Sequence, residues 1–196
     1  EEARRVTDGI RAAGGTGIAV TADVTSEADV AAAVVTVVRD LGPPHVLHNN
    51  VGAATLGSVL DADLDAWTAA VTTNLTSAYL TCRHTLPHML AAGRGAIVNV
   101  SSVASIRDTG YVYPAYSAAK AGVNQLTVSL ALTYAGRGIR ANAILPGLID
   151  TPLVSAEIAA DPEARAARHA RSPTGRMGSP HDVAMSAVKS ASASMS

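Results

Sequence analysis

The sequence YSAAK, residues 116 to 120, places a tyrosine and a lysine four positions apart. In a helix, this spacing puts both side chains on one face, about one turn apart. An apolar run at residues 96 to 100 ends fourteen residues earlier, at the pair Ser101 and Ser102. We predict a helix over residues 115 to 135 and, before it, a strand whose end presents the Ser102 hydroxyl beside Tyr116 and Lys120.

These three side chains suggest a specific chemistry. A tyrosine has a reference pKa of about 10, so a general acid/base tyrosine needs help to hold its phenolate near neutral pH. The Lys120 ammonium can supply that help, and Ser102 can bind the oxygen of a carbonyl or alcohol while Tyr116 exchanges a proton with it. The set therefore points to carbonyl and alcohol interconversion, with hydride carried by a cofactor. The alternative is that Tyr116 and Lys120 form a solvated surface pair.

Helical and extended patterns alternate along the chain, which is typical of a parallel sheet covered by helices on both faces. No linker divides the sequence, so residues 1 to 196 form one predicted α/β domain. Gly14 and Gly15 end the first helix, and Ser26 caps the second. The predicted helices cover residues 1 to 13, 26 to 41, 63 to 92 and 115 to 135, and the predicted strands cover residues 18 to 21, 46 to 48, 96 to 100 and 139 to 145.

The composition excludes several classes of function. With 15 basic and 16 acidic residues, nothing indicates binding to nucleic acid or to a membrane surface. The single Cys82 excludes an internal disulfide, and the apolar stretches are too short to span a bilayer. We predict a cytoplasmic protein without a metal. His84 and His88 have a spacing that metal ligands use, but Pro87 lies between them and no carboxylate completes a site, which favours surface histidines.

Several short motifs follow one another in a defined order. They are Asp23-Val24 and Asn49-Asn50-Val51-Gly52, each after a predicted strand, then Asn74, Ser102, Tyr116 with Lys120, and Pro146-Gly147 leading to Thr151. In order and spacing, this set resembles the short-chain dehydrogenase/reductase family along nearly the whole chain. The resemblance implies a doubly wound, Rossmann-like sheet and an oxidoreductase that uses NAD or NADP on a small-molecule carbonyl or alcohol.

The resemblance also implies roles for the residues after the first strands. The Asp23 carboxylate, with Val24 beside it, would meet the adenine amine, although an aspartate that simply begins a helix is the alternative. Asn50, Val51 and Gly52 end a strand where a ligand approaches such a sheet, and Gly52 permits a close backbone contact. The family usually has alanine where this chain has Val51. A turn without a ligand is the alternative for this segment.

Further roles concern the proton path and the nicotinamide. Asn74 would hold a water that connects to Lys120, unless it is a solvated helix residue. Lys120 would bind the nicotinamide ribose and, with the cofactor's positive ring, lower the pKa of Tyr116. The loop from Pro146 and Gly147 through Ile149 to Thr151 would hold the carboxamide, or it is a simple turn. Arg165, Arg168, His169 and Arg171 lie in the stretch that covers the substrate in this family, so they meet an acidic substrate or form a solvated helix face.

By the same resemblance, the chain begins within the helix after the family's second strand. We therefore expect an incomplete sheet, without the first two strands, the glycine-rich turn and the final strand, and a Ser- and Ala-rich end after Lys189. An open sheet edge predicts poor folding. It also leaves a second function class open, a catalytically silent fragment or an association module. Residues 63 to 92 and the Tyr-Lys helix are the pair that the family uses in homo-oligomers, and the choice between NAD and NADP stays open.

Overall fold

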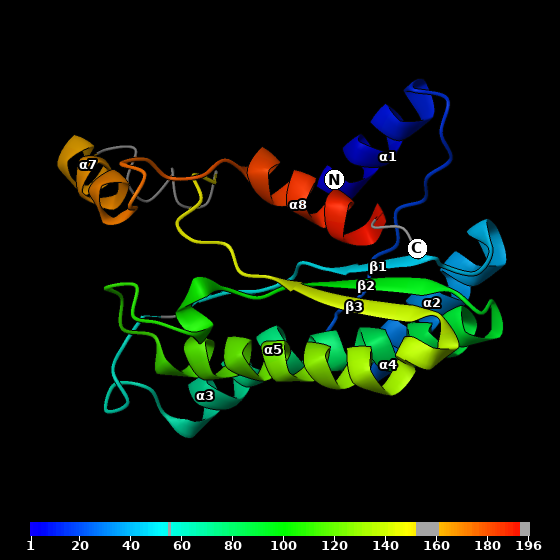
Figure 1. Cartoon of the computed structure of the whole chain (residues 1–196), viewed down its shortest axis with the longest axis horizontal. Helices are drawn as coiled ribbons and strands as arrows, with labels where there is room; N and C mark the ends of the chain where they lie inside the picture. The colour runs from blue at the N-terminus through cyan, green and yellow to red at the C-terminus, as the bar shows by residue number, and fades with distance from the viewer. Residues whose placement is uncertain (55, 152–160, 193–196) are drawn as a thin grey trace.

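The computed structural model describes residues 1–54, 56–151 and 161–192 (Figure 1). The strands and the helices alternate along these residues, as the sequence predicts. In chain order the elements are α1 (Glu2–Ala12), α2 (Glu27–Leu41), β1 (Val46–Asn49), α3 (Leu64–Val71), the π-helical turn η1 (Thr72–Thr76), α4 (Ser77–Ala91), β2 (Gly95–Val100), the 3₁₀ turn η2 (Val103–Ser105), α5 (Pro114–Tyr134), the 3₁₀ turn η3 (Ala135–Arg137), β3 (Ile139–Ile144), α7 (Pro162–Arg171) and α8 (Pro180–Ser192).

The sheet of the described residues has three parallel strands in the order β1-β2-β3. Parallel neighbours require a crossover connection, which α3 and α4 supply between β1 and β2 and α5 supplies between β2 and β3. These crossover helices cover one face of the sheet, and α8 covers the other (Figure 1). The fold is thus α/β with a partial Rossmann-like sheet, as predicted.

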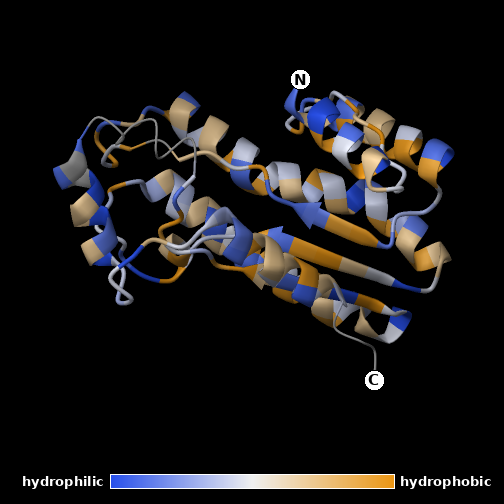
Figure 2. Cartoon of the chain, turned by 90° about the horizontal axis from the view of Figure 1, so that it is seen from above, coloured by the Kyte–Doolittle hydropathy of each residue, from blue (hydrophilic) through white to orange (hydrophobic). Residues whose placement is uncertain are grey.

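The core lies between the sheet and the crossover helices. Met89 of α4, Ile97 of β2 and Ile139 of β3 are almost fully buried and form one hydrophobic cluster. Figure 2 shows the strands as mainly hydrophobic ribbons between helices that alternate polar and apolar residues. This pattern matches a sheet that is shielded on both faces. Within the described residues, no helix combines the length and the hydrophobicity that crossing a bilayer requires.

The helix boundaries that we predicted from capping residues are confirmed. The Ser26 side chain accepts a hydrogen bond from the Asp29 N–H at the start of α2. Gly14, after α1, has φ +83°, and Gly42, after α2, has φ +85°. Residues with a Cβ rarely adopt such positive φ values, so glycine favours the chain reversal that ends each helix.

The predicted strand at residues 18 to 21 is wrong. This segment carries no strand assignment, and it pairs with none of the three described strands. Residues 19 to 21 are exposed, so water can satisfy their backbone groups without a neighbouring strand. As a result β1 is an edge strand, and Val46 at its start is 49% exposed.

Two helices differ from their predicted form. The helix predicted over residues 63 to 92 contains the π-helical turn Thr72–Thr76, which surrounds Asn74. At the other end, α8 continues to Ser192 and so includes part of the Ser- and Ala-rich end after Lys189. Arg140 of β3 explains this extension, because its guanidinium donates hydrogen bonds of 2.9 and 2.7 Å to the carbonyl oxygens of Ser190 and Ala191. Sequence patterns do not reveal such a contact between distant elements.

Candidate active site

Helix α5 places Tyr116 and Lys120 in its first two turns, at the carboxyl end of β2. Pro114 begins the helix, where its missing N–H costs no hydrogen bond. Lys120 is only 3% exposed, and its Nζ donates a 2.8 Å hydrogen bond to the Val100 carbonyl oxygen. The same Nζ lies 5.7 Å from the centre of the Tyr116 ring. The two side chains therefore share one helix face, as the spacing of four predicts.

The serine pair at the end of β2 divides its contacts between α5 and the site. The Ser101 hydroxyl is buried and donates a 3.0 Å hydrogen bond to the Lys120 carbonyl oxygen, which ties the backbone of α5 to the sheet. The Ser102 hydroxyl accepts a 3.2 Å hydrogen bond from the Ala104 N–H, and Ser102 and Tyr116 line the same cavity. In this arrangement Ser101 holds the helix in place, while Ser102 faces the phenol.

Most of the predicted site residues line one cavity of about 210 Å³. They come from the loops that follow all three strands, where ligands bind in open α/β sheets. The predicted residues among its walls are Asn50, Gly52, Ser102, Tyr116, Lys120, Pro146 and Gly147. Folding thus brings together side chains that are nearly a hundred positions apart in the sequence.

Asn74 connects the π-helical turn to the loop after β1. Its Oδ1 accepts a 3.1 Å hydrogen bond from the Ala53 N–H, and its Nδ2 donates to the carbonyl oxygens of Ala53 at 2.8 Å and Ala70 at 2.9 Å. Gly52 lies directly against this amide, since a Cβ there would be 2.8 Å from Asn74 Oδ1 and 3.0 Å from Lys120 Nζ. Asn74 is 2% exposed, so the alternative of a solvated helix residue is wrong.

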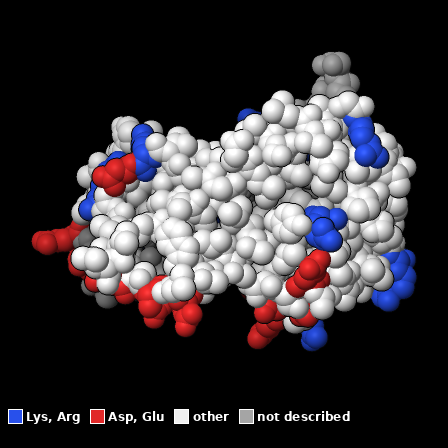
Figure 3. Space-filling view, turned by 90° about the horizontal axis from the view of Figure 1, so that it is seen from below, with Lys and Arg blue, Asp and Glu red and all other residues white. Residues whose placement is uncertain are grey.

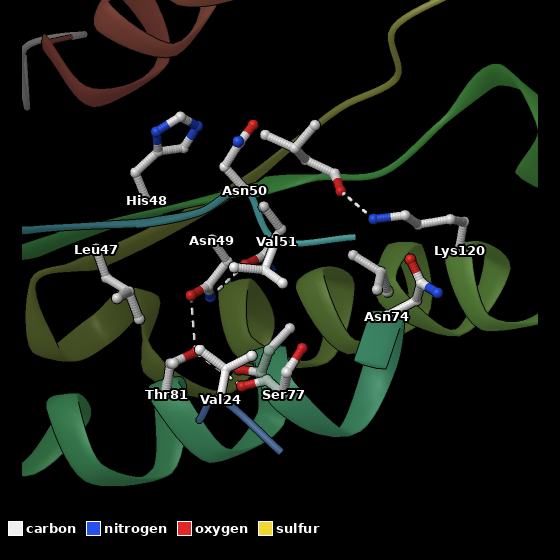
Figure 4. Close-up of a pocket in the computed structure, with 14 residues that line it drawn as sticks. Val24, Leu47, His48, Asn49, Asn50, Val51, Asn74, Ser77, Thr81 and Lys120 are labelled. Atoms are coloured by element: carbon white, nitrogen blue, oxygen red, sulfur yellow. Dashed lines mark hydrogen bonds between the residues drawn. The ribbon is translucent and has the colours of Figure 1, made fainter. Parts of the chain in front are cut away.

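A second cavity, of about 170 Å³, lies beside the first one, on the α4 side of β1 (Figure 4). Val24, Asn50, Val51, Asn74 and Lys120 line it, so Asn50 and Lys120 belong to the walls of both cavities. In Figure 4, Leu47, Asn49 and Val51 lie on the side of β1 that faces Ser77 and Thr81 of α4, whereas His48 and Asn50 point to the opposite side. The two cavities together accommodate a ligand that extends past Lys120.

Three predicted cofactor residues line neither of these cavities. Asp23 is exposed, and its Oδ1 accepts hydrogen bonds from the Thr25 N–H at 2.8 Å and the Thr25 hydroxyl at 2.7 Å. These contacts lie in the turn before α2, whose N-cap is Ser26, so Asp23 itself does not cap the helix. Ile149 pairs with Gly178 in an isolated parallel bridge, and Thr151 ends the described part of the loop before residue 152. Their roles toward a cofactor stay predictions.

Burial changes the acid-base properties of the two central groups. It lowers the pKa of the Lys120 ammonium from 10.5 to about 8, because the charged form loses its solvation. Burial also raises the pKa of the Tyr116 phenol, and the hydrogen bond with Ser102 offsets part of that increase. Lys120 is not among the groups that change the pKa of Tyr116 in this structure. The lowered pKa that we predicted for Tyr116 therefore stays a prediction for the cofactor complex.

A polar network that we did not predict lies beneath the site. The Asn49 amide donates a 2.9 Å hydrogen bond to the Asn99 Oδ1 across neighbouring strands, and the Thr81 hydroxyl donates a 2.7 Å hydrogen bond to the Asn49 Oδ1. The Asn99 amide in turn donates a 2.8 Å hydrogen bond to the Thr127 hydroxyl. The sequence feature that could have indicated this network is an asparagine near the end of each of two apolar strands, Asn49 and Asn99. This network links α4, both strands and α5, and so sets their spacing around the cavity.

His84 of α4 contacts a carboxylate of α2. His84 Nε2 lies 3.2 Å from Glu27 Oε1, and Arg83 contacts the same carboxylate at 3.1 Å. These contacts connect α2 to α4 at the surface. Throughout the described residues, no group of three or more His, Cys, Asp or Glu side chains has an arrangement that could hold a metal ion.

The cavity suits the nicotinamide ribose of a dinucleotide. A Cβ at residue 52 would lie 2.8 Å from Asn74 Oδ1 and 3.0 Å from Lys120 Nζ, so only glycine lets the loop approach the amide and the buried ammonium this closely. Lys120 and Asn50 offer polar groups to ribose hydroxyls, and Gly52 lets the backbone approach them. Pro146 and Gly147 form the opposite wall, where the carboxamide is expected. The residues present thus fit the group that the sequence predicts.

Comparisons with known proteins show the family of this chain. A family model described as enoyl-(acyl carrier protein) reductase matches residues 1–196. The chain is 45% identical to cis-4-hydroxycyclohexanecarboxylate dehydrogenase of Sinomonas cyclohexanicum, over 94% of this chain and 73% of that protein.

Solved structures of other proteins also resemble this chain. A Burkholderia xenovorans protein assigned to the short-chain dehydrogenases/reductases has a TM-score of 0.88 and 39% identity, over 93% of this chain and 71% of that one. A Beutenbergia cavernae protein is described as an NAD(P)-dependent gluconate 5-dehydrogenase with bound NADP at low occupancy. It has a TM-score of 0.85 and 34% identity, over 95% of this chain and 74% of that one. The chain belongs to the short-chain dehydrogenase/reductase family of NAD(P)-dependent oxidoreductases.

Proposed function

We propose that this protein interconverts a secondary alcohol and a ketone, with Tyr116 as the general acid/base. The observation that carries the proposal is the cavity in which Ser102, Tyr116 and Lys120 meet the loop at Gly52. The position of Ser102 and Tyr116 in the wall of one cavity supports it, because one substrate oxygen could contact both hydroxyls. When bound, NAD or NADP supplies the hydride acceptor or donor.

Each residue has one task in the proposed reaction. During oxidation, the Tyr116 phenolate takes the hydroxyl proton while the carbinol C–H bond releases its hydride, and the C–O bond becomes a carbonyl. Ser102 donates a hydrogen bond to the substrate oxygen and fixes its position. Lys120 stabilises the phenolate by its positive charge and binds the ribose hydroxyls. Asn74 keeps the loop around Gly52 in place, and we propose that it also connects Lys120 to solvent through a water.

The test measures cofactor binding and turnover separately. NADH and NADPH are titrated against the purified chain by fluorescence, and reduced nicotinamide is followed by absorbance with 4-hydroxycyclohexanecarboxylate, a substrate class that one relative's name suggests. Tyr116→Phe should abolish turnover and leave cofactor affinity within about twofold, since the phenol acts mainly in the transition state. Turnover in this variant at the rate of the unaltered chain would contradict the assignment. Tyr79→Phe, on exposed α4 surface, is the matched control.

Subunit association is a second candidate function, and we propose a second copy of this chain as the partner. The supporting observation is the outer surface of α4 and α5, where Tyr79, Val128 and Leu132 are 45, 47 and 79% exposed. Figure 3 shows that the centre of this face carries few charged side chains. Sedimentation of the unaltered chain should show a dimer, and Leu132→Glu should shift it to the monomer. A monomeric unaltered chain would contradict this proposal and leave the proposed reaction untouched.

A further inference from the structure

Two arginines of α7 converge on one aromatic ring outside the cavities described so far. The guanidinium of Arg168 lies 5.1 Å from the centre of the Tyr111 ring, and that of Arg171 lies 4.6 Å from it. Arg171 also donates a 3.2 Å hydrogen bond to the Gly110 carbonyl oxygen. An aromatic face attracts a guanidinium, so Tyr111 acts as a platform that holds both side chains in defined positions.

Among the described residues, no carboxylate neutralises the charges of this platform. Two like charges on one ring repel each other, and no ion pair joins Arg168 or Arg171 to a carboxylate in the part of the chain that the structure describes. The Arg168 Nε is buried and has no hydrogen-bond partner there. A buried donor without a partner costs free energy, which an acceptor arriving with a ligand would recover. An anion from a ligand would match the two guanidinium groups and the unpartnered Nε of this platform.

The platform borders a cavity that opens toward the proposed catalytic residues. This cavity, of about 430 Å³, is lined by Arg107 and Arg171 and also by Gly147, which belongs to the wall of the catalytic cavity as well. Aromatic contacts also connect Tyr111 of the platform to Tyr116. The Tyr111 and Tyr113 rings stack with centres 6.1 Å apart, and the Tyr113 ring meets the Tyr116 ring edge-on at 5.3 Å.

Asp108 is the acidic residue that this cavity contains. Its Oδ1 accepts a 2.8 Å hydrogen bond from the Gly110 N–H, so the carboxylate stabilises the turn between residues 108 and 110. With Arg107 and Arg171 on the walls and Arg168 on the adjoining ring, the local charge stays positive after Asp108 is counted. Arginine is well suited to such a site, because its planar fork binds carboxylate or sulfonate oxygens in a bidentate manner.

We propose that Tyr111, Arg168 and Arg171 form an anion subsite that selects substrates carrying a carboxylate or sulfonate remote from the reacting alcohol. This inference adds a substrate class to the proposed function, and its statement about turnover rests on that function. The shared cavity wall at Gly147 places the anionic end of a substrate over the platform while its hydroxyl reaches Ser102 and Tyr116.

The first experiment measures anion binding without turnover. Cyclohexanecarboxylate and the uncharged cyclohexanecarboxamide are titrated against the full chain by ligand-observed NMR. We expect the carboxylate to bind about tenfold more tightly than the amide, a difference of about 1.4 kcal/mol. Arg171→Gln should remove most of this preference, Arg171→Lys should restore part of it, and added salt should weaken it. Arg137→Gln, at the far end of α5 on an exposed turn, is the matched control and should change nothing.

A kinetic experiment separates this inference from the proposed function. Two substrates, 4-hydroxycyclohexanecarboxylate and its carboxamide, are compared by their kcat/KM values in the unaltered chain and in the Arg168→Gln and Arg171→Gln variants. Selective anion binding without turnover of either compound would contradict the proposed reaction and support the subsite. Equal kcat/KM values, or equal affinities in the NMR titration, would overturn the subsite while leaving the reaction intact. Because Arg171 is exposed, its variants are expected to fold normally.

Discussion

The Lys120 ammonium donates a 2.8 Å hydrogen bond to the Val100 carbonyl oxygen, which joins α5 to the carboxyl end of β2. This bond fixes the cation beneath the site, where it is only 3% exposed. A buried ammonium is costly to the folded state, and its pKa of about 8 expresses that cost. The position most central to the proposed chemistry therefore reduces the stability of the fold.

Replacing Lys120 with methionine should reveal this cost as a pH-dependent difference in stability. The folded chain releases the Lys120 proton at about pH 8, whereas the unfolded chain keeps it up to 10.5. Below pH 8, the buried ammonium lowers the free energy of unfolding of the unaltered chain by its full amount. This loss disappears as the pH rises toward 10.5, so the free energy of unfolding of the unaltered chain should rise by about 3 kcal/mol relative to the Lys120→Met variant. Urea unfolding of both proteins across this range measures it. A stability difference that does not change with pH would contradict the assignment of the lowered pKa.

The titration of Tyr116 should depend on the cofactor. Burial holds the phenol pKa above its usual value of 10 in the chain alone, so little phenolate exists at neutral pH. The positive nicotinamide of a bound oxidised cofactor, together with Lys120, should lower this pKa. The difference in ultraviolet absorbance between the unaltered chain and Tyr116→Phe isolates this one tyrosine during a pH titration. An unchanged midpoint at saturating NAD or NADP would oppose the general-base role.

Gly52→Ala should damage the site more than an ordinary glycine substitution. The new Cβ would lie 2.8 Å from Asn74 Oδ1 and 3.0 Å from Lys120 Nζ, so at least one of these side chains must move. We expect a loss of about 1 to 3 kcal/mol in unfolding free energy and at least tenfold weaker NADH or NADPH binding. Gly136→Ala is the control, since no atom lies within 4 Å of its added Cβ. Equal cofactor affinity in both variants would exclude the close approach that we propose at Gly52.

Asn74→Ala should loosen the loop after β1. The substitution removes the hydrogen bonds to both backbone groups of Ala53, and we expect a cost of about 2 to 3 kcal/mol because these groups lose their partner. Urea unfolding measures the total loss of unfolding free energy. Amide hydrogen exchange should become faster specifically at Ala53. Asn142→Ala, whose amide contacts the Ser190 carbonyl oxygen at 3.4 Å, is the control. Unchanged exchange at Ala53 would show that the loop does not depend on Asn74.

Local sequence signals predicted those features that depend on near neighbours. Ser26 and Gly42 marked the ends of α2 because caps are decided by residues within one turn. The spacing of Tyr116 and Lys120 predicted a shared helix face because helical geometry is regular. The same logic failed at residues 18 to 21, since an extended pattern becomes a strand only where a neighbour accepts its hydrogen bonds.

By itself, the sequence determined the alternation of helices and strands, the parallel sheet and the identity of the Ser102, Tyr116 and Lys120 set. Only the tertiary structure decided which predicted residues share a cavity, and it placed Asp23 outside while adding Ser101 and the Asn49–Asn99 amide pair to the supports of the site. It also decided that Arg168 and Arg171 share the Tyr111 ring. The physical reason is that helix and strand periodicity act over a few residues, whereas burial, pKa and packing depend on contacts between segments that are far apart in the chain.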